Sequence, residues 1–181
     1  MKFLSIIVLL SITALMSLIG CHTAPTTEGG KKSLDIMTQE SIDDFRHRDP
    51  SLASRMDKAY GYAVFPSVGK GGAGVGGAYG KGEVFEQGRM TGFCDLSQGT
   101  VGLQLGGQKY SELILFENKA ALDRFKAGQF AVAAQASAVA ANSGAAANAK
   151  YDNGVMIFTA AEKGLMAEAA VGGQKFTYQP K

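Results

Sequence analysis

Residues 61–82 read GYAVFPSVGKGGAGVGGAYGKG, a short apolar run followed by a stretch dominated by glycine. Fifteen of the 24 glycines in the chain lie between Gly61 and Gly107. Glycine inside a strand lets a sheet coil sharply, or lets a second backbone approach closely. This segment therefore predicts a Gly-rich, strongly coiled or barrel-like β-sheet.

The run from Gly72 to Gly77 also satisfies the GxGxxG pattern of dinucleotide-binding proteins. That motif requires a helix directly afterwards, whose N-terminus faces the pyrophosphate. Here Gly80 and Gly82 follow, and then an apolar strand that begins at Val84. We therefore interpret these glycines as part of the sheet and expect no nucleotide cofactor.

Further strands and one helix are predicted downstream. Gln87-Gly88 is typical of a turn between two strands. Asn118 is a good N-cap for a helix to Ala127, and Gly128 is a typical C-terminal stop. The predicted strands are Val84–Glu86, Thr91–Leu96, Thr100–Gln108, Leu113–Phe116, Val155–Ala160, Leu165–Val171 and Lys175–Tyr178.

The Ala-rich segment at residues 129–141 is compatible with either a helix or a strand. Helix propensity favours a helix. Alternation of Phe130, Val132 and Ala134 with polar residues favours a strand with one small-residue face. We predict a strand for residues 130–141.

Upstream of residue 61, two amphipathic helices are predicted, Ser33–Arg48 and Leu52–Tyr60. In the first, Leu34, Met37, Ile42 and Phe45 fall on one side, which we expect to pack on the domain core. The predicted fold is thus α+β, predominantly antiparallel β, with N-terminal helices and one helix near residues 118–127.

The N-terminus resembles a lipoprotein signal peptide. Lys2 precedes an apolar stretch from Phe3 to Leu18, which ends in Leu-Ile-Gly-Cys at Cys21. We expect cleavage after residue 20 and attachment of acyl chains, palmitate among them, to Cys21. Residues 21–32 are then a lipid-anchored flexible tether, and residues 33–181 form a single domain.

The residue after Cys21 bears on location. In Gram-negative bacteria Asp at that position favours retention in the inner membrane, and this chain has His22. We expect the protein to be anchored in the outer membrane, facing the periplasm. The inner membrane and the cell surface remain open as alternatives.

Composition argues against several functional classes. Without Lys2 the chain has 17 basic and 16 acidic residues, which argues against nucleic-acid binding by bulk charge. With Cys21 acylated, Cys94 has no disulfide partner, and two histidines are too few for a typical metal site. His47 has no evident triad partner. We expect no cofactor, no metal and no enzymatic activity.

Two segments of the chain are similar to each other. Gly106-Gly107-Gln108-Lys109-Tyr110 resembles Gly172-Gly173-Gln174-Lys175-Phe176. If the similarity is structural, Lys109 and Lys175 occupy equivalent positions on two strands and form a paired basic feature.

Five blocks of sequence resemble the SYLF domain, a family of bacterial secreted proteins, lipoproteins and eukaryotic membrane-trafficking proteins. The blocks are residues 59–66, 70–82, 99–106, 113–125 and 163–167. The resemblance implies binding of phosphoinositides or other anionic lipids. In the yeast branch of the family it also implies binding of actin. Lys70 and Lys81 match basic family positions and are headgroup candidates by resemblance. The chain lacks the Trp that the family usually has near Thr91.

The sequence therefore predicts a membrane-anchored lipoprotein that binds phospholipids or other anionic lipids. Its candidate headgroup contacts are Lys70, Lys81, Lys109 and Lys175. The alternative is an envelope lipoprotein that uses the same domain to bind another protein, since Gly-rich strand edges allow such pairing.

Overall fold

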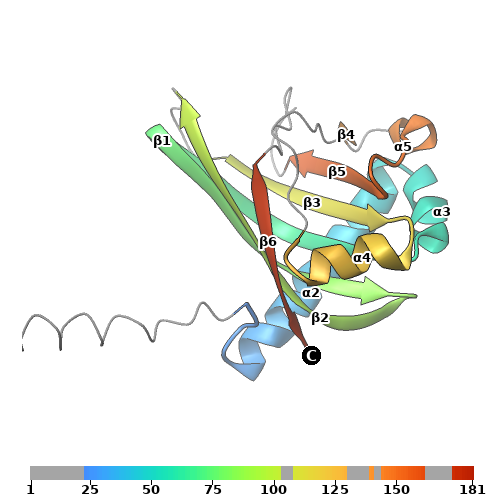
Figure 1. The fold of residues 1–181 in the computed structure, drawn as a ribbon, viewed down its shortest axis with the longest axis horizontal. Coiled ribbons are helices and arrows are strands. Elements are labelled where there is room, and N and C mark those ends of the chain that lie inside the picture. The colour runs from blue at the N-terminus through green and yellow to red at the C-terminus, as the bar shows by residue number, and fades with distance from the viewer. Residues whose placement is uncertain (1–22, 103–107, 130–138, 141–143, 162–172) are drawn as a thin grey trace, which may run out of the picture.

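A six-stranded sheet, in the order β4-β5-β3-β1-β2-β6, is the centre of the molecule (Figure 1). This computed structural model describes residues 23–102, 108–129, 139–140, 144–161 and 173–181. The β4–β5 pair is parallel and the other four pairs are antiparallel. The strands are β1 Gly61–Glu86, β2 Arg89–Gly102, β3 Gln108–Phe116, β4 Val139–Ala140, β5 Val155–Ala161 and β6 Gln174–Pro180. The α+β class is confirmed, and the sheet is open rather than closed into a barrel.

Strand β1 doubles back, so that its beginning lies beside its end. The Gln87 amide donates to the Tyr60 carbonyl at 3.1 Å. A Cβ added at Gly61 would lie 2.6 Å from the Phe85 carbonyl oxygen, and one at Gly82 would overlap the Val64 carbonyl. Glycine is therefore required where the two halves of β1 meet, as the Gly-rich sequence predicted.

The turn between β1 and β2 is the one predicted from the sequence. Gln87 and Gly88 both have positive φ, at 49° and 76°. Two consecutive residues of this kind match the twist of the flanking strands in a tight hairpin. The run at residues 72–77 has strand geometry and leads into this ribbon, so it opens no helix.

Helices cover both faces of the sheet. On one face, α4 (Lys119–Lys126) closes the first core, which includes Phe116, Phe125 and Phe176. On the other, α2 (Glu28–Arg48), α3 (Ser51–Lys58) and α5 (Ala145–Asn148) close the second core, to which Phe45 and Phe158 belong. Figure 1 shows α4 and α2 on opposite sides of the strands. Burial of these apolar side chains is the main stabilising contribution.

The segment predicted to be a flexible tether is folded in its described part. Helix α2 begins after Thr27, whose hydroxyl accepts from the Gly30 amide at 3.0 Å, and not after Ser33. Thr23 and Ala24 are buried against the sheet. The polar composition of residues 23–32 concealed this, because the segment is held by backbone groups, hydroxyls and the single apolar contact of Ala24.

Of the other predictions, one is confirmed, one is wrong, and several concern residues that the structure does not describe. The Asn118 cap is confirmed, since its Oδ1 accepts from the Ala121 amide at 3.0 Å. Met37 faces solvent, at 41% exposure, although it was expected to pack inward. The signal at residues 1–20, Cys21, the strand at 165–171 and most of residues 130–141 lie outside the described residues. None of the described helices is long and apolar enough to cross a bilayer.

Candidate functional site

The first described residues dock on the face of the sheet that α2 covers. The Ala24 amide donates to Gln179 Oε1 at 3.1 Å, and the hydroxyls of Thr23 and Thr177 are 3.1 Å apart. Lys81 Nζ donates to the Thr23 carbonyl at 2.9 Å. Contacts to both β1 and β6 therefore hold this segment in place.

A pocket of about 480 Å³ opens beside the docked segment, and we call it the N-terminal pocket. Its apolar part includes Ala24 and Phe93, which pack with Leu34 in a small third cluster. Its lining residues are Ala24, Glu28, Lys31, Lys32, Asp35, Glu83, Met90, Phe93, Gln179, Pro180 and Lys181. The lining thus combines apolar groups, basic groups and acidic groups.

Glu83 is the buried acid of the N-terminal pocket. Its side chain belongs to β1, and the residue is 1% exposed. Its Oε2 has no hydrogen-bond partner within the described part of the chain. The pKa of the Glu83 carboxyl is raised to about 7, mainly by burial and in part by the Asp35 carboxylate, whereas the nearby Thr38 hydroxyl and Lys181 lower it. A buried carboxylate without a full set of hydrogen-bond partners is costly when ionised, so Glu83 is a candidate ligand-binding residue.

Three lysines surround the same pocket. Lys31 Nζ lies 2.7 Å from Glu28 Oε1, an exposed pair within the first turn of α2. Lys32 and Lys181 are exposed and form no salt bridge with the residues that the structure describes. The lysines are at the mouth, whereas Glu83 is buried.

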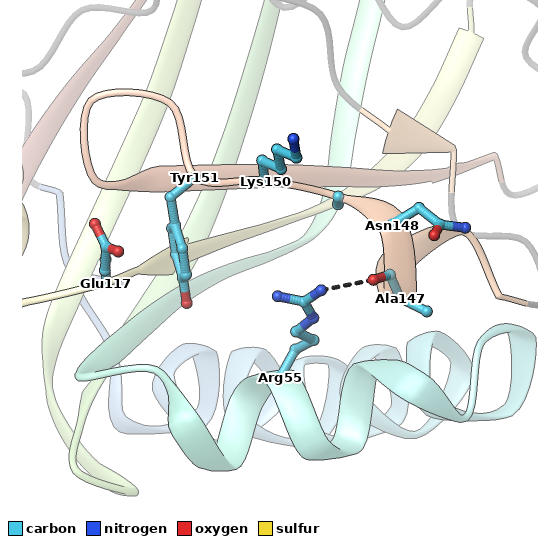
Figure 2. Close-up of a pocket in the computed structure, with 7 residues that line it drawn as sticks. Arg55, Glu117, Ala147, Asn148, Lys150 and Tyr151 are labelled. Carbon is cyan, nitrogen blue, oxygen red and sulfur yellow. Dashed lines mark hydrogen bonds between the residues drawn. The ribbon is translucent and has the colours of Figure 1, made fainter.

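A second pocket, of about 500 Å³, lies between α3 and α5 (Figure 2). Arg55 of α3 points toward α5, and its Nη2 donates to the Ala147 carbonyl at 2.8 Å. Tyr151 and Glu117 lie at the other end of the pocket. The guanidinium already holds the two helices together, so we interpret this pocket as structural.

The structure does not bring the four predicted lysines together. Lys81 Nζ is 3.2 Å from Asp95 Oδ1 and donates to the Thr23 carbonyl, so it helps to hold the docked segment, and its contact with a headgroup stays a prediction. Lys70 pairs with Gln108, whereas Lys109 pairs with Gly69, so Lys70 and Lys109 lie close together but on opposite faces. Lys175 is exposed on β6, which β2 separates from β1 in the sheet.

Lys175 nonetheless lies in a row that borders the docked segment. Tyr79, Ser97 and Lys175 are aligned across β1, β2 and β6. Tyr79 is 51% exposed, and its ring centroid is 5.9 Å from Lys81 Nζ. The next row of residues on this face contains Lys81 and Thr177, and both contact Thr23. An exposed aromatic ring and a lysine thus lie next to the start of the described chain.

The similarity between the two Gly-Gly-Gln-Lys segments has a structural counterpart. Gln108 begins β3 and Gln174 begins β6, so Lys109 and Lys175 are each the second residue of a strand. Both are exposed, and the aromatic residues that follow them are buried in the first core. They are equivalent in position, but β1 and β2 separate their strands.

Sequence reasoning missed Glu83, Lys31, Lys32 and Lys181 as members of one site. Glu83 has no paired acid in the sequence, and Lys31 and Lys32 lie in the segment interpreted as a tether. The one available signal was an acid in a strand whose neighbours, Val84 and Phe85, are apolar. That signal indicates burial but not a pocket.

Comparison with known proteins agrees with the resemblance seen in the sequence. Residues 97–181 match the family model described as Ysc84, Las17-binding protein actin regulator. The chain is also 29% identical over 156 residues to Beta cell expansion factor A of Aeromonas veronii, which covers 83% of this chain and 58% of that relative. It therefore spans little more than half of the relative's length. Residues 97–181, a little under half of the chain, are thus similar to the Ysc84 family, in agreement with the resemblance to SYLF domains.

Proposed function

We propose that this chain is a non-enzymatic lipoprotein of the bacterial envelope whose folded domain binds phospholipid at the surface of the membrane that anchors it. The anchor is the acylated Cys21, and the proposed location is the periplasmic face of the outer membrane. The Ysc84 family and the signal-like N-terminus support this function.

The observation that carries the proposal is the docking of Thr23 and Ala24 beside the N-terminal pocket, with Cys21 only two residues before Thr23 in the sequence. Two residues span at most about 7 Å. An acylated Cys21 would hold this pocket at the bilayer surface, whereas a free tether of twelve residues would leave the domain to rotate.

The chemistry of the same surface suits a membrane interface. Lys31, Lys32 and Lys181 line the pocket, and Lys175 lies beside the docked segment. Each lysine near an anionic surface contributes about 1 kcal/mol. Tyr79 supplies a ring with an apolar body and a polar tip, a combination suited to the interface. High affinity of the domain is unnecessary, because the anchor keeps its local concentration high.

Vesicle sedimentation tests the proposal. The chain from His22 onward contains every described core residue and hydrogen bond, and it lacks the anchor. We expect it to sediment with vesicles of phosphatidylcholine and phosphatidylglycerol, and less so at high salt because screening weakens charge contacts. The variant Lys150→Gln, altered in the pocket of Figure 2, is the control and should sediment like the parent. Absence of sedimentation at every lipid composition would contradict the proposal.

Intact-mass analysis tests the anchor separately. We expect the protein purified from a bacterial membrane to begin at Cys21 and to carry the mass of its acyl chains. An uncleaved leader or an unmodified thiol would contradict the anchoring.

A protein partner is the second candidate function. Ile36 and Met37 are adjacent on α2 and are 49% and 41% exposed, which is unusual for large apolar side chains beside each other. The family description itself names a protein that relatives bind. This candidate predicts that the chain from His22 ignores vesicles but co-purifies with a defined envelope protein, and that Ile36→Ser abolishes the co-purification.

A further inference from the structure

We propose that the N-terminal pocket binds the phosphoethanolamine headgroup of a phospholipid, with Glu83 receiving the ammonium and Lys31, Lys32 and Lys181 receiving the phosphate. The inference rests on the proposed function and specifies its ligand. It follows from four observations on this pocket.

The first observation is the unmet requirement of Glu83. The residue is 1% exposed, and Oε2 has no partner in the described part of the chain. Buried charges in proteins are paired or hydrogen-bonded, because removing them from water is costly. The lysines are at the mouth of the pocket and none forms a salt bridge with Glu83 among the described residues. A primary ammonium that enters the pocket would supply both the charge and the N–H donors.

The second observation is the separation of charge within one cavity. The acids Glu83 and Asp35 line the same pocket as the three lysines. A simple anion would be attracted to the lysines but would leave Glu83 unpaired. A simple cation would be repelled at the mouth. A zwitterion whose ammonium and phosphate are joined by an ethylene bridge matches both ends.

The third observation is the apolar part of the lining. Ala24 and Phe93 are buried, and Met90 is half-buried beside them. They provide a surface for the ethylene bridge and the glycerol carbons. The volume of about 480 Å³ is within the range of pockets that bind small molecules, roughly 300–1,000 Å³.

The fourth observation selects a lipid over a soluble headgroup. The docked Thr23 and Ala24 form one side of the site, and the proposed anchor at Cys21 is two residues away. A headgroup in the pocket would therefore belong to the bilayer that the acyl chains enter. The ligand class is a phospholipid with a primary amine.

The experiment compares three vesicle compositions with the chain from His22 onward. Phosphatidylcholine is the background, and equal fractions of phosphatidylethanolamine or phosphatidylglycerol are added. Choline has no N–H group, so it cannot donate to Glu83, and glycerol has no cation. We expect binding to rise at least about tenfold with phosphatidylethanolamine, as expected for hydrogen bonds to a charged group.

Two variants and a control assign that preference to the pocket. Glu83→Gln keeps the size of the side chain and should abolish the preference for phosphatidylethanolamine while binding to phosphatidylglycerol vesicles persists. The double variant of Lys32→Gln and Lys181→Gln should weaken binding to both lipids. Glu117→Gln, an acid of the pocket in Figure 2, should leave both unchanged. Thermal unfolding of each variant establishes that it is folded.

The outcomes separate this inference from the proposed function. Equal binding to phosphatidylethanolamine and phosphatidylcholine, with binding to phosphatidylglycerol retained, overturns the inference and leaves the proposed function standing. A preference that survives Glu83→Gln also overturns it. Binding of soluble phosphoethanolamine without a vesicle preference overturns the lipid as the source. No binding to any vesicle removes both proposals.

Discussion

Two buried glutamates on opposite faces of the sheet show how similar burial produces different outcomes. Glu112 is 0% exposed in the first core, where Gln174 Nε2 donates to its Oε2 at 2.9 Å. Glu83 is 1% exposed on the α2 side, where it lines the N-terminal pocket. Burial raises the pKa of the Glu112 carboxyl to about 8 and that of Glu83 to about 7.

A raised pKa by itself therefore does not define a binding site. Glu112 is enclosed by core side chains and has an amide partner, so at neutral pH it is mostly protonated and acts as a polar part of the core. Gln174 Nε2 is also 3.4 Å from the Tyr110 hydroxyl, which links β3 to β6. Glu83 has a cavity and basic residues beside it. One carboxyl oxygen of each glutamate lacks a hydrogen-bond partner among the described residues, so the cavity and the basic residues beside Glu83, rather than the pKa, distinguish the two positions.

The largest expected effect tests whether the first core is the more tightly packed region. Phe125→Ala removes a fully buried ring that lies 5.0 Å from Phe116 and 5.1 Å from Phe176. We expect it to lower the free energy of unfolding by about 3–5 kcal/mol. Phe93→Ala should cost about half as much, because one side of the buried Phe93 ring borders the N-terminal pocket rather than packed side chains. Urea unfolding measures both, and equal losses would remove this difference between the regions.

The second prediction concerns the pH dependence of stability. Between about pH 4.5 and 8 the unfolded chain loses the Glu112 proton while the folded chain keeps it. The folded state then binds more protons, so the free energy of unfolding falls as pH rises through this window. The fall is at most about 1.4 kcal/mol per pH unit from this group.

Glu112→Gln should flatten that dependence, and urea unfolding at pH 5, 6, 7 and 8 measures it. Glu117→Gln, an exposed acid next to the end of β3, is the control and should keep the slope of the parent. A slope unchanged by Glu112→Gln would mean that Glu112 is ionised in the folded state.

The third prediction sharpens the contrast by applying the same change to Glu83. Its raised pKa has the same sign, so its contribution to stability is also lost as pH rises, in a window that ends near pH 7. Glu83→Gln should therefore flatten the pH dependence of the free energy of unfolding less than Glu112→Gln does. The two variants should differ by roughly 1.4 kcal/mol over the full pH range, because the two pKa values differ by about one unit. Addition of phosphatidylethanolamine vesicles should stabilise the parent but not this variant. Equal flattening by both variants would contradict the ordering of the two pKa values.

The smallest expected effect concerns the docked segment. Thr177→Val removes the hydroxyl that contacts Thr23 and keeps the shape of the side chain. We expect the free energy of local opening around residues 23–27 to fall by about 0.5–1.5 kcal/mol. Hydrogen exchange should therefore become faster in this segment alone. Thr159→Val, in β5, is the matched control and should leave that segment unchanged. Exchange that is already fast in the parent would restore the flexible tether predicted from the sequence.

Local signals were sufficient for much of the fold. Gln87-Gly88 requires positive φ at both residues, Asn118 caps its helix, and the glycines at Gly61 and Gly82 allow two backbones to meet. Each of these features depends on a few neighbouring residues.

The candidate site was predicted less well. Lys81 was selected as a headgroup contact, but it pairs with Asp95 and holds Thr23. Lys70 and Lys109 lie on opposite faces because their partners across β1 and β3 differ by one residue. Pairing register is a property of two strands together, and a single strand's sequence does not contain it.

The sequence was sufficient for the class of fold, the glycine-dependent sheet, the Asn118 cap and the resemblance to SYLF domains, and it also predicts an anchor at Cys21. These are local or compositional properties, which survive without knowledge of distant contacts. Only the tertiary structure shows that residues 23–32 are folded against the sheet instead of forming a flexible tether. It also shows that Glu83, Lys32 and Lys181 share one pocket. The reason is that the pocket is assembled from the start of the chain, the middle strands and the last residues, and only folding brings such distant segments together.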